Sequence, residues 1–231
     1  MPRYCRIILV SFLLAACSTA PGDKNSHFDP SQLAKADIDR ISEVHRAQLD
    51  ASLKVLAEKL YRRNPREWRN AGQPNLEAAI ARIFAAPNYR LPELGTRTGT
   101  DAIVLGLQAD YKGDRVAAFV AGMGSMIDTT FNGKREFYMY DSLDPQHLYN
   151  AARNIEIAAW KLANSRDEEG RLLLLSNDMA SIQNLSFERE FGRMIGNLDL
   201  LSEIIAGKTN RTVVKIVQSL ATAVFLPVGI H

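Results

Sequence analysis

Three side chains that could bind a metal or transfer protons, Asp141, Asp144 and His147, lie within seven residues of one another. An aspartate and a histidine three residues apart can share one helix face and ligate a metal. However, Asp144 is followed by Pro145, and this pair is typical of a helix start in which the aspartate caps the first turn. We therefore expect Asp144 to be a helix cap and His147 to be exposed in the first turn. No metal site is predicted.

The carboxylates of Glu188 and Glu190 are too close in sequence to act as a catalytic pair. Residues two apart on a helix face different ways, and Arg189 and Arg193 supply charge partners on the same segment. A solvated helix face is the expected structure.

Two glycine-containing segments suggest other chemistries. In Gly122-Met123-Gly124-Ser125-Met126-Ile127, a nucleophile elbow would need glycine at position 127 and a preceding strand. Ser125 is therefore predicted to be a packing residue. The segment 95–100 could hold an anion on its backbone amides, but it lacks the lysine and the spacing of a phosphate-binding loop. It is interpreted as a helix-entry loop, and no cofactor is expected.

The N-terminus has the pattern of an export signal. Arg3 and Arg6 precede Ile7 to Ala16, ten uncharged residues. As a helix this run would span roughly 15 Å, about half of a bilayer's hydrocarbon core, so it is too short to cross a membrane. Residues 1–16 are therefore interpreted as a signal peptide.

The sequence Leu14-Ala15-Ala16-Cys17 at the end of this run resembles the lipobox of bacterial lipoproteins. The resemblance implies that the Cys17 thiol receives diacylglycerol, that a peptidase cuts before Cys17, and that the new amine is acylated. Ser18 stands where aspartate would favour inner-membrane retention. The resemblance therefore implies a protein attached by its N-terminal lipid to the outer membrane, facing the periplasm.

Removal of residues 1–16 changes the composition that matters for function. The whole chain has 28 basic and 26 acidic side chains, and loss of Arg3 and Arg6 leaves 26 of each. Such a balanced chain lacks the charge excess of a nucleic-acid-binding protein. Cys5 is also removed, so Cys17 is the last cysteine. Disulfides, cysteine-based zinc sites and thiol nucleophiles are excluded on this count.

The densest positive patch is the segment 62–69, which also contains a tryptophan. One interpretation is contact with anionic lipid headgroups, glycan phosphates or an acidic partner protein. The other, which we favour, is a solvated helix end whose cations complement the helix dipole. The candidate contact residues are Arg62, Arg63, Arg66, Trp68 and Arg69.

Helical periodicity dominates the rest of the chain. A flexible tether over 17–28 leads to a single domain over 29–231, whose first helix is expected to start at Pro30 and end at Asn64. His45 is expected to be packed and hydrogen-bonded beside its apolar stripe. The polar residues expected on its solvated faces include Asp39, Arg46 and Asp50.

The following helices are expected at about 75–87, 100–107, 116–127, 145–162, 182–207 and 212–226. Ala118, Gly122 and Ser125 form a small face that allows close helix packing. The segments 136–140 and 172–175 could be strands or linkers. The predicted fold class is all-α, a bundle of about six to eight helices with little or no β-structure.

No catalytic constellation stands out, so the sequence favours a non-enzymatic envelope lipoprotein with a binding, scaffolding or assembly role and an envelope protein partner. One alternative is a carrier of an apolar ligand. The other is an enzyme acting on peptidoglycan or lipid, whose acid–base groups would come from Asp141, Asp144, His147 and Glu188.

Overall fold

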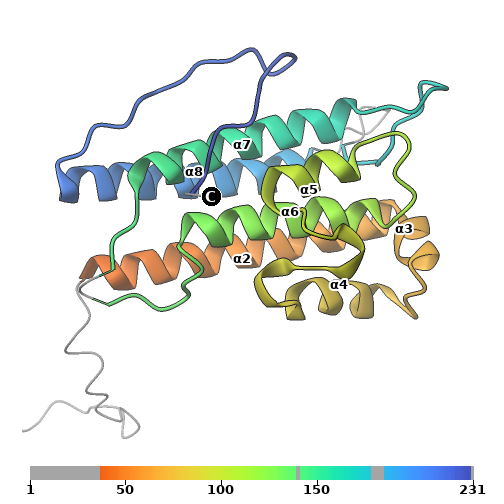
Figure 1. Ribbon diagram of the computed structural model, residues 1–231, viewed down its shortest axis with the longest axis horizontal. Coiled ribbons are helices and arrows are strands. Elements are labelled where there is room, and N and C mark those ends of the chain that lie inside the picture. Colours follow the sequence, from red (N-terminus) through yellow and green to blue (C-terminus); the bar gives the residue numbers. More distant parts are fainter. Residues whose placement is uncertain (1–36, 139–140, 178–184, 230–231) are drawn as a thin grey trace, which may run out of the picture. The chain divides into compact units, whose positions relative to one another are not determined.

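The computed structural model describes residues 37–138, 141–177 and 185–229, and this part of the chain is all-α (Figure 1). It contains seven α-helices, and the single β-contact is an isolated bridge between Arg166 and Leu172. The predicted fold class is therefore confirmed. The helices are α2 (Asp37–Arg63), α3 (Pro65–Asn70), α4 (Leu76–Ala85), α5 (Gly99–Gly106), α6 (Arg115–Thr130), α7 (Pro145–Asn164) and α8 (Ser186–Thr209), with 3-10 turns η2 (Pro87–Tyr89) and η3 (Pro92–Leu94).

Several expectations lie outside the described residues. They concern the signal segment 1–16, Cys17, the tether over 17–28 and the helix start at Pro30. No helix in the described ranges is both long and apolar enough to cross a membrane.

Helix α6 lies at the centre of the core and packs against α2, α5 and α7. Every one of its residues from Val116 to Asp128 is buried. The predicted small face is where α5 packs. A Cβ on Gly122 would lie 2.7 Å from the carbonyl oxygen of Gly99 and 2.7 Å from the amide nitrogen of Ile103. Close contact between these two helices therefore depends on glycine at this position.

Helix α2 buries the leucines of its predicted apolar stripe, but two residues expected on its solvated faces, Asp39 and Arg46, are buried as well. Arg46 is only 1% exposed, and its guanidinium donates to Asp128 Oδ1 on α6 at 2.9 Å. It also lies 5.4 Å from the centre of the Phe131 ring. The prediction was wrong because helical position alone does not reveal an acidic partner 82 residues away.

Helix α8 packs against both α2 and α7. The His45 Nδ1 atom lies 2.7 Å from the side-chain oxygen of Asn197, which confirms a packed, hydrogen-bonded histidine. Glu190 is not solvated as expected but is buried, 3.0 Å from Arg193 and 3.6 Å from Lys59. The helix continues to Thr209, beyond Gly207, and Asn210 adopts the left-handed conformation that ends it.

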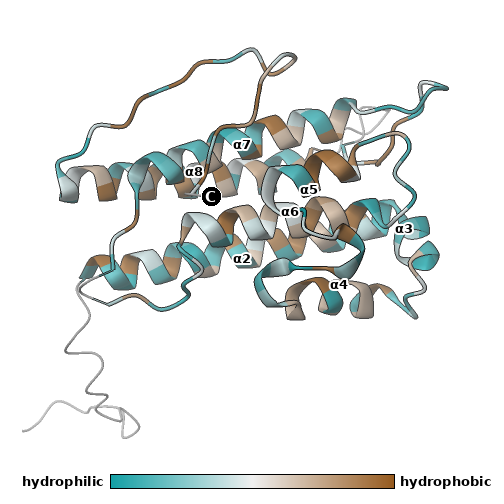
Figure 2. Cartoon of the chain, in the orientation of Figure 1, coloured by the Kyte–Doolittle hydropathy of each residue, from teal (hydrophilic) through white to brown (hydrophobic). Residues whose placement is uncertain are grey.

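The predicted last helix over 212–226 is wrong: residues 211–229, here called the C-terminal segment, contain no helix and cross over α7 (Figures 1 and 2). Threonine, valine and isoleucine dominate its first half, and β-branched residues favour extended backbone. Side-chain amides of α7 supply the partners that a helix would have supplied. Gln146 pairs with both the N–H and the C=O of Val214, and Asn154 pairs likewise with Leu226.

The segments left open between strand and linker form no strand in the described residues. Residues 136–138 follow a turn, and 139–140 lie outside the described part. Leu172 belongs to the isolated bridge, and the backbone of Leu175 pairs at both its N–H and its C=O with the side-chain amide of Asn64.

Candidate functional site

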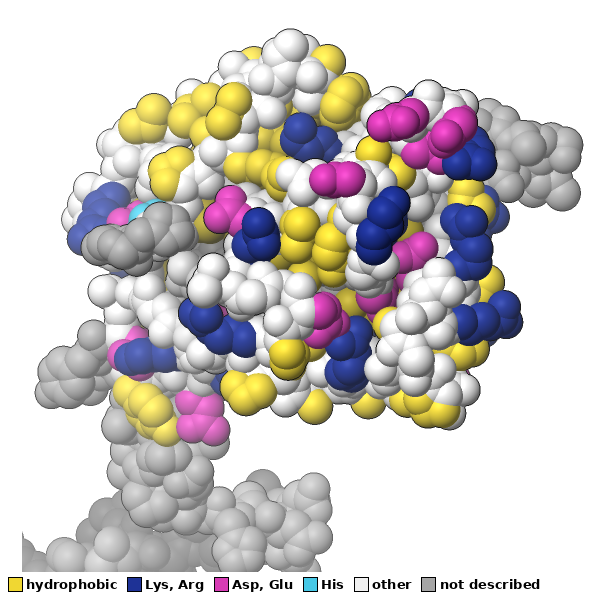
Figure 3. Space-filling model, turned by 45° about the vertical axis from the view of Figure 1, so that its right-hand side comes forward, with side chains coloured by type: hydrophobic (Ala, Val, Ile, Leu, Met, Phe, Trp, Pro, Cys, Tyr) yellow, Lys and Arg dark blue, Asp and Glu magenta, His cyan; other side chains and the backbone are white. Residues whose placement is uncertain are grey.

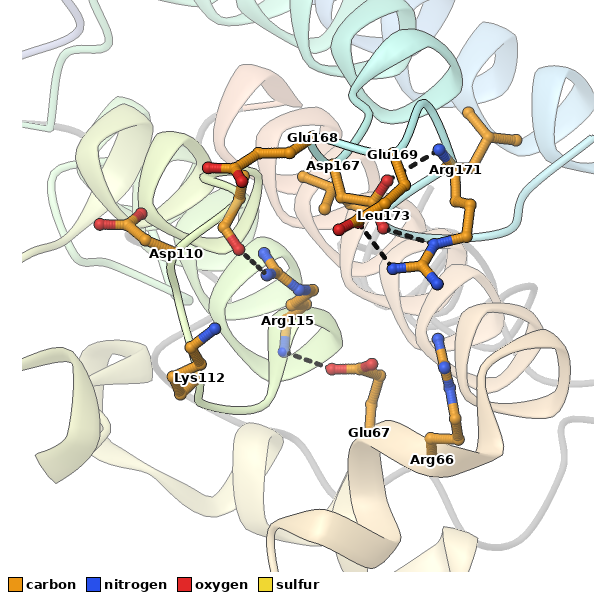
Figure 4. Close-up of a pocket in the computed structure, with 12 residues that line it drawn as sticks. Arg66, Glu67, Asp110, Lys112, Arg115, Asp167, Glu168, Glu169, Arg171 and Leu173 are labelled. Carbon is orange, nitrogen blue, oxygen red and sulfur yellow. Dashed lines mark hydrogen bonds and ion pairs between the residues drawn. The ribbon is translucent and has the colours of Figure 1, made fainter.

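A charged cleft of about 690 Å³ opens at the end of the bundle where α3 and two loops meet (Figure 4). One loop, residues 107–114, joins α5 to α6, and the other, residues 165–173, follows α7. The cleft is lined by Arg66, Glu67, Ala109, Asp110, Lys112, Arg115, Asp167, Glu168, Glu169, Arg171, Leu172 and Leu173.

The guanidinium of Arg115 builds the wall of this cleft but is not free to bind a ligand. It donates to four backbone carbonyl oxygens at the end of α5 and in the following loop, those of Gly106, Gln108, Ala109 and Tyr111. Because these carbonyls have no helical partner, the arginine both caps α5 and fixes the loop.

Glu67 lies at the base of the cleft and is 9% exposed. Its Oε2 atom accepts a hydrogen bond of 2.9 Å from the amide of Arg115, the first residue of α6. Asp114 caps the same helix by accepting from the amide of Ala117 at 2.8 Å, and it also accepts from the hydroxyl of Tyr61. Two carboxylates therefore accept hydrogen bonds from backbone amides at the N-terminus of α6, where the helix dipole favours negative charge.

Burial raises the pKa of the Glu67 carboxyl above its usual value of 4.5. The folded protein thus holds this proton more tightly than the unfolded chain does. The contribution of the protonated carboxyl to the free energy of unfolding is therefore fully present below pH 4.5. It is lost as the pH rises through the pKa of the group in the folded protein. We expect Glu67→Gln, which keeps an acceptor for the Arg115 amide, to gain stability relative to the native protein between about pH 4 and about pH 7.

Urea unfolding of both proteins at the two pH values measures this difference. Glu77→Gln, at an exposed position in the first turn of α4, serves as the control and should show no such trend. A stability difference for Glu67→Gln that is the same at both pH values would contradict the assignment.

The loop after α7 is organised by its own charges. Arg171 donates from Nε to Asp167 at 2.8 Å and from Nη2 to Glu169 at 2.8 Å, and its amide donates to Asp167 as well. Arg166 donates to the carbonyl of Gly170 at 2.9 Å. The loop after α7 is therefore an ordered turn in which Asp167 and Arg171 are already paired.

Four charged side chains of the cleft have no hydrogen bond or ion pair among the described residues: Arg66, Asp110, Lys112 and Glu168. All four are exposed. In Figure 4, Arg66 and Lys112 lie on opposite sides of Glu67, and Glu168 lies above them in the view. Figure 3 shows basic and acidic side chains interspersed over one face of the protein. The cleft thus offers both signs of charge at its opening.

The predicted basic patch is divided by the structure. Arg66 faces the cleft, whereas Arg62 pairs with Glu58 on the exposed side of α2. Trp68 packs against the core, and the guanidinium of Arg69 lies 5.1 Å from the centre of its ring. Arg63 is half-buried. Sequence proximity therefore grouped residues that point in different directions.

Two of the residues considered for metal binding or acid–base chemistry, Asp141 and Asp144, have structural partners. Asp141 accepts from the Tyr138 amide and pairs with Lys134. Asp144 caps α7, accepting from the Gln146 amide at 2.8 Å, as predicted. His147 is half-buried rather than exposed. No group of three potential metal ligands occurs in the described residues.

The residues that line a second cavity, of about 540 Å³, include Ser125, Asp128, Asp144 and His147. The Ser125 hydroxyl donates to the carbonyl of Ala121 at 2.8 Å and accepts from the amide of Gly99 at 2.7 Å. It is thus engaged in helix packing, in agreement with the prediction. Glu188, the remaining candidate, is exposed and accepts from Asn177.

Sequence reasoning missed most of the cleft. Its members come from three separate segments, and only Arg66 belonged to a predicted patch. The available signal was the high density of charged residues in the loops 107–114 and 165–173. Comparisons with protein-family models, with curated proteins and with solved structures find no match to this chain.

Proposed function

We propose that this chain is a lipid-anchored protein of the bacterial envelope with a non-enzymatic binding, scaffolding or assembly role, and that the charged cleft is its binding site. The anchor is the lipid on Cys17, implied by Leu14-Ala15-Ala16-Cys17. In this proposal the helical domain faces the periplasm from the outer membrane and holds an envelope protein partner.

The observation that carries this proposal is that some charged side chains of the cleft have partners within the protein and others do not. Arg115, Arg171 and Glu67 are occupied by partners within the protein. By contrast, Arg66 and Lys112 together with Asp110 and Glu168 are left for a ligand. Cations and anions at one opening complement a surface of mixed charge, such as a folded protein or a peptide. A polyanion would instead meet repulsion from the acidic members.

Binding is favoured over catalysis by the contacts of the groups that could react. A general base needs to reach a nucleophile or a substrate proton. In the described residues, the Glu67 carboxylate accepts from a helix N-terminus, and the Ser125 hydroxyl donates to a helix carbonyl. Neither is paired with a residue that would activate it.

We expect a photocrosslinking amino acid at Lys112 to capture a partner in living cells, because this exposed residue lines the cleft. Arg66→Glu should remove most of the adduct, because it makes the opening predominantly acidic. The matched control is Arg62→Glu, an equal charge change on a side chain that is 64% exposed and does not line the cleft. Immunoblotting of the adduct measures both.

Two results would contradict the proposal. One is an adduct that Arg62→Glu and Arg66→Glu reduce equally, since the cleft would then have no special role. The other is turnover of peptidoglycan or phospholipid by the purified protein at a rate that a single substitution abolishes.

A further inference from the structure

Helix α7 holds the C-terminal segment through a row of polar side chains. These side chains lie three or four residues apart, so they share one face of the helix. They are here called the polar ridge and are Gln146, Tyr149, Asn150 and Asn154. Asn154 is fully buried, and its side-chain amide pairs with both the N–H and the C=O of Leu226, each at 2.7 Å. Asn150 donates to the carbonyl oxygen of Pro227 at 2.8 Å.

The first part of the segment is held in the same way. Gln146 accepts from the amide of Val214 at 2.8 Å and donates to its carbonyl oxygen at 3.1 Å. The hydroxyl of Tyr149 accepts from the amide of Ile216 at 3.1 Å and donates to its carbonyl oxygen at 3.2 Å. All these bonds join the ridge to main-chain atoms. The polar ridge is therefore a surface that binds an extended polypeptide by its backbone.

The side chains of the segment add little to its attachment. Val217 is 97% exposed and Val224 71% exposed, and Ala223 is the one buried residue among residues 211–229. Phe225 and Val228 are half-buried and pack against the edge of the core. The segment can therefore leave α7 while the helices stay packed, because local opening requires little free energy where few apolar contacts are lost.

The connection from α8 to the segment is short and exposed. Helix α8 ends at Thr209, Asn210 has a left-handed backbone, and the first pair with the ridge is made at Val214. Residues 207–212 are all exposed. A change of backbone direction at Asn210 would redirect everything that follows without disturbing the core. Short connections of this kind favour the exchange of a terminal element between two copies of a chain.

We propose that the C-terminal segment is exchangeable: the polar ridge of one copy binds the segment of a second copy, so that two copies are linked through α7. A second copy fits because its segment offers the same backbone groups in the same order. Its charges fit as well. Arg211 lies 3.6 Å from Asp144, and Lys215 lines a cavity with Asp199 and Glu203. Each of these cations would meet the same acidic side chains on the other copy.

Exchange would give the proposed scaffolding role a physical form, and this consequence rests on the proposed function. Association costs translational and rotational freedom, so we expect the closed form to dominate in dilute solution. Copies anchored by lipid on one membrane would be confined near each other, and confinement raises the effective concentration of the second segment.

The test uses the chain 17–231 with Cys17→Ser, which carries no lipid, and two complementary variants of it. Val214→Pro with Leu226→Pro, the segment variant, removes two main-chain amides that donate to the ridge and leaves the ridge vacant. Gln146→Leu with Asn154→Leu, the ridge variant, removes the side-chain amides that hold these residues and leaves the segment intact but released.

We expect neither variant to associate with itself, whereas their mixture should form a heterodimer in sedimentation velocity. In this heterodimer the intact segment of one chain lies on the intact ridge of the other. Apparent affinity scales with the fraction of molecules in the competent form. The mixed pair should therefore associate roughly tenfold or more tightly than the parent chain associates with itself.

The matched control is Val217→Pro with Leu220→Pro, which places two prolines at amides without a hydrogen bond among the described residues. Leu220 is the second residue of a turn closed by the Thr222 amide and the Ser219 carbonyl, where proline is favoured. The control keeps its own segment on the ridge. Mixed with the ridge variant, it should associate no more tightly than the parent chain does.

Absence of the heterodimer, or equally tight association of the control, would overturn the proposal. Circular dichroism of the two variants checks their fold, and loss of helical signal in either would overturn it too, because the segment would then be an integral part of the bundle. In the parent chain, hydrogen–deuterium exchange at Val214, Ile216 and Leu226 should be faster than in α6, and equal protection would contradict local release. None of these results depends on the lipid or the charged cleft, so failure here is distinguishable from failure of the proposed function.

Discussion

Replacing Gly122 with alanine is expected to lower the free energy of unfolding by roughly 1–3 kcal/mol, the usual cost of forcing extra volume into a packed core. The new Cβ would lie 2.7 Å from the Gly99 carbonyl oxygen and 2.7 Å from the Ile103 amide nitrogen. Both are backbone atoms of α5, so no side chain can move aside and the two helices must separate. The clash outweighs the gain in helix propensity that alanine brings.

Gly196→Ala on α8 is the matched control, because nothing lies within 4 Å of a Cβ added there. This variant should gain up to about 1 kcal/mol from helix propensity alone. Urea unfolding followed by circular dichroism measures both variants. If Gly122→Ala is as stable as Gly196→Ala, then α5 and α6 are not in the close contact described.

The second large effect is expected for Arg46→Met. It should lower the free energy of unfolding by about 3–5 kcal/mol, the usual loss when one partner of a buried ion pair is removed. The variant leaves Asp128, only 7% exposed, without the guanidinium that lies 2.9 Å away in the native protein. It also removes the charge that faces the Phe131 ring and Asp50. The substituted methionine retains the apolar volume but cannot replace the hydrogen bonds.

Two further variants test this account of Arg46. Arg62→Met also breaks an arginine–carboxylate pair, but on the exposed face of α2, and it should change stability by less than about 1 kcal/mol. Arg46→Met combined with Asp128→Leu should lose less stability than the two single variants together, because the orphaned carboxylate is gone. Additive losses, or equal losses for Arg46→Met and Arg62→Met, would mean that the two buried charges are not coupled.

The two interactions also show how far sequence reasoning extends. The small face of Ala118, Gly122 and Ser125 follows from helical spacing, and the structure places α5 against it. Helix caps such as Asp144 follow from local residue patterns and are found as expected. Contacts between residues close in sequence are therefore readable, because the helical period fixes their relative positions.

Long-range pairing of polar groups could not be predicted in this way. The burial of Arg46 depends on Asp128 of another helix, and the extended C-terminal segment depends on Gln146, Tyr149 and Asn154 of α7. Residues 212–226 were expected to be helical from their sequence. Side-chain amides of α7 instead form hydrogen bonds with backbone groups that a helix would pair internally. The cleft likewise assembles from three segments that no local pattern connects.

The most direct test of the central claim, a lipid anchor on Cys17, is the intact mass of the protein purified in detergent from bacterial membranes. We expect a chain that begins at Cys17 and carries the added mass of diacylglycerol and an amide-linked acyl group. Cys17→Ser should abolish this species and release the protein from the membrane fraction. A native chain that keeps residues 1–16, or that begins elsewhere with an unmodified Cys17, would contradict the account.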